Sequence, residues 1–171
     1  AERAYLISVS VGLSARAMKE TTPDRKKLFG KSSYLVTLFL NFFAMHPIDF
    51  QVELDGERME FRASDLMAAN CGSLGYKALR WWPEVQPDDG HLNLCYLEAT
   101  TGFDYLWVVF NFLLQRHIRT KRLDHVPAQR TVTIREPQNL PVQGDGDWIG
   151  NTPIQVHLEP AALKIAVPVK S

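Results

Sequence analysis

Two acidic residues flank a single glycine in the stretch VQGDGDWIGNTP, from Val142 to Pro153. Asp145-Gly146-Asp147 suits a tight hairpin turn, because Asp tolerates left-handed backbone angles and Gly adopts a positive φ without strain. The same spacing also holds two carboxylates on a rigid turn, where they could accept a proton from a hydroxyl or hold a metal-bound phosphate. On the triplet alone, the turn is the better supported interpretation.

A second acidic turn lies in PEVQPDDGHLNL, from Pro83 to Leu94. Asp88 and Asp89, together with the backbone carbonyls around them, offer the hard oxygen ligands that a divalent cation prefers. The stretch lacks the regularly spaced acids of an EF-hand, and Asp-Asp-Gly is also an ordinary turn sequence. From the residues alone, a polar turn ahead of a strand is favoured over a cation site.

Two further features could contact ligands. The basic segment RHIRTKRLDH, from Arg116 to His125, suits the negative end of a helix dipole or, alternatively, anionic lipid headgroups. The pair Trp81-Trp82 fits a core or interface anchor better than a stacking platform for nucleic acid, because no basic stripe accompanies it. No histidine has a partner at metal-ligand spacing, and the sequence contains neither a Gly-x-Ser-x-Gly elbow nor a Walker-type loop.

The elements that would position these residues are mostly strands. Apolar and polar residues alternate on both sides of Asp55-Gly56, which predicts a hairpin from Phe50 to Ala63. Other short apolar segments predict strands at 5–11, 65–70, 91–97, 131–135, 142–145, 154–158 and 163–167. Apolar residues at helical spacing predict two helices, at about 31–46 and 102–120. We therefore expect a mainly β fold, a two-layer antiparallel β-sandwich with two added helices.

The composition is that of an ordinary soluble protein, with 46% apolar and 22% charged residues among 171. The 19 basic and 19 acidic side chains cancel, so no overall field attracts nucleic acid. We expect one β-sandwich domain over residues 1–171. The lack of a signal-peptide pattern and the presence of only two cysteines favour a cytoplasmic location. Because the sequence lacks an initiator Met and starts almost directly in a strand, we expect it to be a piece of a larger protein.

Several segments share their order and spacing with a known superfamily. They are VSVGLSARAM, KKLFGKSSYLVTLFL, DLMAANCGSLG, PEVQPDDGHLNL and QGDGDWIGNTPIQVHLEPAALKIAVP. In this order they resemble the C-terminal half of the diacylglycerol kinase and sphingosine kinase superfamily, closest to the bacterial lipid kinases. The resemblance extends from about Tyr5 to Pro168, and in the superfamily this half is a β-sandwich that follows a nucleotide-binding domain.

The resemblance implies a phosphoryl-transfer site and a structural metal site. In the superfamily an Asp-Gly-Glu turn faces the cleft between the domains, so Asp145 and Asp147 become the candidate catalytic residues, with Asp147 in place of the usual Glu. The other acidic turn resembles a structural magnesium site, whose ligands here would be Asp89 and the backbone carbonyls of Gln86 and His91. ATP, the co-substrate, would bind a Gly-Gly-Asp-Gly-Thr loop of the N-terminal domain, and this sequence contains no such loop.

The leading hypothesis is a lipid-binding domain that completes the active site of an ATP-dependent lipid kinase, acting on a hydroxyl of diacylglycerol or a sphingoid base. Without the nucleotide-binding domain, we expect this piece alone to be inactive. The expected partners are that domain, the lipid substrate, a transiently contacted membrane surface and a second copy in a homodimer, but no nucleic acid. Two alternatives stay open: a non-catalytic regulatory or binding module of the same fold, and a carbohydrate-binding β-sandwich that uses Trp81 and Trp82.

Overall fold

The computed structural model describes residues 3–20, 46–72, 82, 84–114, 122–164 and 166. Within these residues the chain forms ten strands in two antiparallel sheets and two helices, which confirms the expected mainly β sandwich. The strands are β1 Ser8–Gly12, β2 Ile48–Leu54, β3 Glu57–Ala63, β4 Asp65–Ala69, β5 Leu92–Leu97, β6 Leu123–Ala128, β7 Thr131–Glu136, β8 Pro141–Gly144, β9 Asp147–Asn151 and β10 Ile154–His157. The helices are α1 Leu13–Glu20 and α4 Gly102–Leu113.

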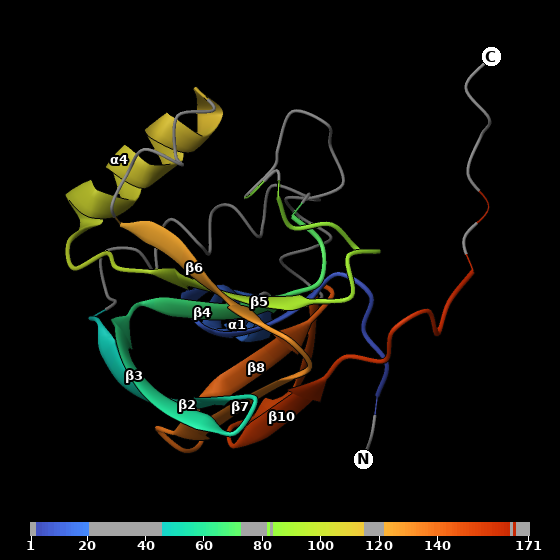
Figure 1. Ribbon diagram of the computed structural model, residues 1–171. Coiled ribbons are helices and arrows are strands. Elements are labelled where there is room, and N and C mark those ends of the chain that lie inside the picture. Colours follow the sequence, from blue (N-terminus) through green and yellow to red (C-terminus); the bar gives the residue numbers. More distant parts are fainter. Residues whose placement is uncertain are drawn as a thin grey trace.

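The two sheets enclose an apolar core between them (Figure 1). The larger sheet has the strand order β6-β5-β4-β1-β8-β9, and the smaller sheet has the order β10-β7-β2-β3. Side chains alternate along the strands, so that in β2 Phe50, Val52 and Leu54 are buried while Asp49 and Gln51 are exposed. The core also contains Val9, Val11, Leu66, Leu94, Val132, Ile134 and Val142.

The predicted hairpin at Asp55-Gly56 is confirmed. β2 and β3 pair in register from Ile48 opposite Ala63 to Leu54 opposite Glu57. Both turn residues have a positive φ, 51° at Asp55 and 93° at Gly56. A two-residue turn with this geometry matches the twist of the strands that it joins, and Asp-Gly is a preferred sequence for it.

Helix α1 is an element that the sequence analysis missed. It follows β1 directly and contacts β1, β8 and β9 on the face of the larger sheet that points away from the core (Figure 1). Leu13, Ala15 and Ala17 are buried, and the small alanines allow the helix to approach the strands closely. With only eight residues, α1 is too short to show a helical period clearly.

Other predicted elements need correction. Residues 123–125, which the sequence analysis places in the basic end of the second helix, are instead the first residues of β6, and β9 was not predicted. At the other end of the chain, Leu163, Lys164 and Ala166 lie outside any strand, so the strand predicted at 163–167 is wrong for these residues. The second predicted helix is confirmed over 102–113, whereas residues 115–120 lie outside the described residues. The helix predicted at 31–46 also lies outside them, except for His46, which is not in a helix.

Candidate functional site

The acidic turn joins two strands at the edge of the larger sheet. Asp145 and Gly146 connect β8 to β9, and both have a positive φ, 48° and 93°. Gly144, the last residue of β8, pairs with Asp147, the first residue of β9. The turn expected from the triplet is therefore present, and its geometry is that of the Asp55-Gly56 hairpin.

Asp145 holds the chain segment that leads into β1. Its Oδ2 accepts the amide hydrogen of Leu6 at 2.7 Å, and its Oδ1 accepts those of Ile7 and Ser8, each at 2.9 Å. The backbone amide of Asp145 in turn donates to the carbonyl of Ser8 at 3.0 Å. Because three donors converge on it, this carboxylate fixes the position of the strand beside the turn.

Asp55 makes the same set of contacts in the smaller sheet. Its carboxylate accepts the amide hydrogens of Gln129, Arg130 and Thr131, and its own amide donates to the carbonyl of Thr131 at 3.0 Å. Desolvation opposes ionisation of Asp55, but the three amides outweigh it and lower the pKa of this carboxyl. We call Asp55 and Asp145, each with its three amides, the two aspartate clamps.

Asp55→Asn and Asp145→Asn are each expected to lower the free energy of unfolding by about 1–3 kcal/mol. Asn tolerates the same backbone angles, but its amide nitrogen cannot accept a hydrogen bond and would face the backbone donors. Urea denaturation measures the change. Asp49→Asn is the control, because this side chain is 82% exposed and 3.9 Å from Arg62. Clamp variants as stable as this control would contradict the assignment.

Asp147 differs from Asp145 in having its carboxylate available. The side chain is exposed, and no hydrogen bond or ion pair engages it within the part of the chain that the structure describes. Its neighbour Trp148 is 50% exposed, and the Nζ of Lys19 on α1 lies 5.6 Å from the centre of the Trp148 ring. Of the two acids predicted from the sequence, Asp147 is thus the one whose carboxylate is exposed and not engaged by another described residue.

Asp65, which the sequence analysis did not select, is an acid in a desolvated position beside α1. Its Oδ1 accepts the backbone amide of Ser14 at 3.2 Å and the Ser14 hydroxyl at 3.0 Å. Burial raises the pKa of Asp65 to about 7, although the two hydrogen bonds from Ser14 act in the opposite direction. No sequence motif marks Asp65, because α1 and β4 meet only in the folded chain.

In the turn before β5, which holds the second candidate site, the amide of Asp89 donates to the carbonyl of Gln86 at 3.3 Å. The Asp89 carboxylate accepts the amide hydrogens of Gln86 at 3.0 Å and His91 at 2.8 Å, so it lies next to the two residues whose carbonyls were predicted as ligands. One carboxylate and two carbonyls are hard oxygen donors and fit Mg²⁺ in kind. No group of three or more His, Cys, Asp or Glu side chains suited to a metal occurs in the described ranges. The magnesium site at Asp89 therefore remains a prediction.

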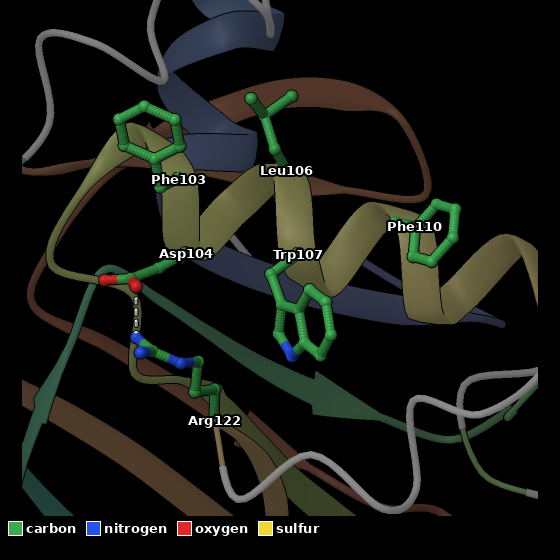
Figure 2. A pocket seen from close by; sticks show the side chains of 6 residues that line it. All are labelled: Phe103, Asp104, Leu106, Trp107, Phe110 and Arg122. Carbon is green, nitrogen blue, oxygen red and sulfur yellow. Dashed lines mark ion pairs between the residues drawn. The ribbon is translucent and has the colours of Figure 1, made fainter.

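Helix α4 begins with a capping arrangement that also fixes a basic residue. The Thr101 hydroxyl accepts the amide hydrogen of Asp104, while Asp104 Oδ2 accepts the amides of Thr100 and Thr101, each at 2.9 Å. Desolvation opposes ionisation here too, but these hydrogen bonds and that of the Thr100 hydroxyl prevail and lower the pKa of Asp104 to about 2. Arg122 forms an ion pair with the same carboxylate (Figure 2).

The outer face of α4 is apolar and exposed. Phe103 is 84% exposed and Trp107 is 56% exposed, and the large apolar residues of this face are Phe103, Leu106, Trp107, Phe110 and Leu114. All but Leu114 line a shallow pocket together with Asp104 and Arg122 (Figure 2). We call these five apolar residues the α4 face. No described helix is long and apolar enough to cross a membrane.

The tryptophan pair does not form a ligand platform as far as the structure describes it. Trp82 is only 5% exposed, and its ring lies 4.6 Å from that of His125, so it belongs to the core as expected. Trp81 lies outside the described residues, as does the basic segment up to Lys121. A carbohydrate site built on both tryptophans is therefore contradicted by the burial of Trp82.

A family profile described as "YegS C-terminal NAD kinase beta sandwich-like domain" matches residues 7–167. "Putative lipid kinase SERP0390" of Staphylococcus epidermidis is 24% identical over 162 residues, which cover 92% of this chain and 51% of that protein. "Putative lipid kinase SH2167" of Staphylococcus haemolyticus is 26% identical over 159 residues, with the same coverage of 92% and 51%. The solved "putative diacylglycerol kinase" of Bacillus anthracis str. Sterne has the same fold, with a TM-score of 0.64 at 21% identity over 91% of this chain and 50% of that chain.

The two sheets and the matches together define a lipid-kinase-like C-terminal β-sandwich domain. The chain belongs to the YegS C-terminal family of NAD kinase-like β-sandwich domains. It spans about half the length of the curated relatives that it matches.

Proposed function

We propose that this domain completes the active site of an ATP-dependent lipid kinase. The family and the names of the relatives support a lipid kinase, and the coverage of about half of each relative supports a further nucleotide-binding domain N-terminal to this one. The reaction transfers the γ-phosphoryl group of ATP to a hydroxyl of a lipid such as diacylglycerol or a sphingoid base. On this proposal the present chain is the lipid-binding C-terminal domain and is inactive alone.

Asp147 accepts the proton of the lipid hydroxyl in this proposal. The hydroxyl oxygen forms a bond to the γ-phosphorus, the bond to the leaving oxygen of ADP breaks, and the hydroxyl proton moves to the Asp147 carboxylate. The observation that supports this role is that the Asp147 carboxylate is exposed and makes no hydrogen bond or ion pair within the described residues. The Asp145 carboxylate, in contrast, accepts three backbone amides. Asp145 then acts on the reaction by holding the turn.

Magnesium has two places in the proposal. Bound with ATP, it would supply positive charge that offsets the charge of the phosphates. A structural Mg²⁺ would be held by Asp89 and the carbonyls of Gln86 and His91, where it would stabilise the turn that leads into β5.

A direct assay tests the proposal. The full-length protein that carries this chain is incubated with Mg²⁺, labelled ATP and detergent micelles that contain diacylglycerol or a sphingoid base. We expect label in one of these lipids, and none when this chain is used alone. A full-length protein that binds ATP but labels neither lipid would contradict the kinase function. That outcome would favour a non-catalytic module, the alternative supported by the shorter Asp147 in place of the superfamily's Glu.

We also propose that the α4 face contacts the surface of an anionic bilayer. Aromatic and aliphatic side chains on one face of a helix, next to basic residues, are the pattern of interfacial membrane helices. The sequence from Tyr105 to Leu123 contains four Arg or Lys residues and no acid, and only Arg122 is paired, with Asp104, among the described residues. The charge left over complements anionic headgroups. This placement would bring the domain to the membrane in which its lipid substrate resides.

Phe103→Ala combined with Trp107→Ala is expected to weaken binding to vesicles of phosphatidylglycerol and phosphatidylcholine about tenfold or more. The reason is that both side chains would bury apolar area in the bilayer. Added salt should also weaken vesicle binding of the wild-type protein, because it screens the attraction between basic residues and anionic headgroups. Co-sedimentation with vesicles measures the effect. Trp148→Ala is the matched control, because Trp148 is 50% exposed but lies on β9.

Equal losses in the control and the α4 variant would contradict the membrane proposal. It would also be wrong if, without lipid, the α4 variant converted a homodimer into a monomer in ultracentrifugation, because the α4 face would then be covered by a second copy.

A further inference from the structure

A row of hydrogen bonds connects the acidic turn with the desolvated Asp65. The amide of Gly146 donates to Gln143 Oε1 at 2.8 Å, and Gln143 Nε2 donates to Ser10 Oγ at 2.7 Å. Ser10 Oγ and Ser14 Oγ are 2.7 Å apart, and the Ser14 hydroxyl donates to Asp65 Oδ1 at 3.0 Å. We call Gln143, Ser10, Ser14 and Asp65 the polar network.

The chemistry of the groups fixes the direction of these hydrogen bonds. The amide of Gly146 can only donate, so the side-chain atom of Gln143 that faces it must be the oxygen, and the nitrogen must face Ser10. At the other end, Asp65 Oδ1 is an acceptor, because it accepts the backbone amide of Ser14, which can only donate. The Ser14 hydroxyl therefore donates to the same oxygen, and Ser10 donates to Ser14. Every donor therefore points from the turn toward Asp65, and such aligned chains strengthen each bond.

The polar network is placed where apolar residues would be expected. Ser10 is fully buried between α1 and the sheet, and its neighbours in β1, Val9 and Val11, face the core on the other side. Buried hydroxyl and amide groups weaken a fold unless all of them are paired, whereas small apolar residues would fill the same contact without this requirement. The network also joins four separate elements, β8, β1, α1 and β4.

The acidic turn is thereby held on two sides. Asp145 is fixed through its carboxylate to the segment before β1, and Gly146 is fixed through its amide to Gln143. Asp147 follows directly and is the residue of the turn left to act on a ligand. A displacement of about 1 Å at a reacting group can cost about 100-fold in rate, so a rigid turn has direct value for proton transfer.

We infer that Gln143, Ser10, Ser14 and Asp65 are positioning residues that hold Asp147 in place for proton transfer. This inference rests on the proposed kinase function of the turn. These residues would affect the rate without touching the substrate. The most distant of them, Asp65, is connected through four hydrogen bonds to Gly146, the neighbour of Asp147.

The test uses Gln143→Met and Ser14→Ala in the full-length protein, with phosphorylation of diacylglycerol as the assay. Met has a shape close to that of Gln but cannot make the hydrogen bonds of Gln143 to Gly146 and Ser10. Ala at position 14 removes the hydroxyl that connects Ser10 to Asp65, which is the third hydrogen bond of the row counted from Gly146. We expect kcat to fall about 10- to 100-fold for Gln143→Met, with smaller losses for Ser14→Ala and with KM for ATP and lipid within about twofold. Site-resolved hydrogen exchange should show the Gly146 amide exchanging about tenfold faster in both variants.

Thr152→Val is the matched control. The Thr152 hydroxyl is buried, accepts the Leu140 amide at 3.0 Å and donates to the Pro137 carbonyl at 2.6 Å. Among the described residues, no hydrogen bond of this hydroxyl leads to the acidic turn. Val has nearly the same shape, so this variant should lose comparable stability without loss of kcat or of Gly146 protection. If Gln143→Met matches Thr152→Val in kcat, or if Ser14→Ala leaves exchange of Gly146 unchanged, the positioning role is wrong.

Asp147→Asn separates a failure of this inference from a failure of the proposed function. If Asp147→Asn loses kcat and Gln143→Met does not, the polar network is structural only and the kinase proposal stands. If Asp147→Asn retains kcat, or if the full-length protein phosphorylates no lipid, the proposed role of the turn fails and the positioning inference fails with it.

Discussion

Asp147→Asn is expected to lower kcat for lipid phosphorylation by about 10²- to 10⁴-fold in the full-length protein, the usual cost of removing a general base. The amide of Asn keeps the size of the side chain but cannot take up the hydroxyl proton. KM for ATP should stay nearly constant, because the nucleotide binds the other domain in our proposal. Steady-state kinetics with diacylglycerol micelles measures both constants.

Two further variants sharpen this result. Asp147→Glu restores the longer side chain of the superfamily and should retain kcat or increase it. Asp145→Asn should act mainly on stability, because its carboxylate is engaged by the amides of Leu6, Ile7 and Ser8. Wild-type turnover in Asp147→Asn would show that the turn has no part in catalysis.

Asp65→Asn is expected to make the protein more stable than the wild type at pH 8, with a difference that disappears toward pH 4. The pKa of Asp65 is raised from its ordinary value of 3.8 to about 7 in the folded chain, so folding favours the protonated acid. That contribution is fully present below pH 3.8 and is lost as the pH rises through about 7. Asn cannot ionise and therefore avoids the loss.

The size of this effect follows from the shift. At about 1.4 kcal/mol for each pKa unit, the difference between the two proteins changes by at most about 4 kcal/mol over this pH range. This value is an upper limit because part of Asp65 stays accessible to water. Urea denaturation of both proteins at several pH values provides the measurement, and a difference independent of pH would show that Asp65 ionises normally.

The sequence predicted those parts of the fold whose cause is local. Asp55-Gly56 and Asp145-Gly146 both form hairpin turns, because residues with these backbone preferences determine a two-residue turn by themselves. The strands of the core were also found, since β1, β4 and β5 bury most of their residues. The missed strands β6 and β9 are the two edges of the larger sheet, where few side chains are buried and Pro127 and Gly150 interrupt the pattern.

The roles of the acids depend on contacts that the sequence does not display. The resemblance selected Asp145 and Asp147 together, and only the fold distinguishes an engaged carboxylate from an available one. Asp145 meets Leu6 across 139 positions of the sequence, and Asp65 meets Ser14 across 51. Residue spacing carries no information on encounters of this kind, so neither the clamp nor the polar network could be predicted.

The clamp at Asp145 has a consequence for the order in which the molecule assembles. The β8–β9 hairpin can form early from neighbouring residues, but its carboxylate finds its donors only after a loop of nearly the whole chain has closed, and such distant contacts form slowly. The clamp at Asp55 spans 76 positions and closes a shorter loop. A chain that stalls before β1 inserts between β4 and β8 would therefore keep most of its local hairpins and lack a fixed acidic turn. With the role that we propose for Asp147, catalytic activity would then depend on the last step of folding, because partly folded molecules would not hold this acid in its folded position.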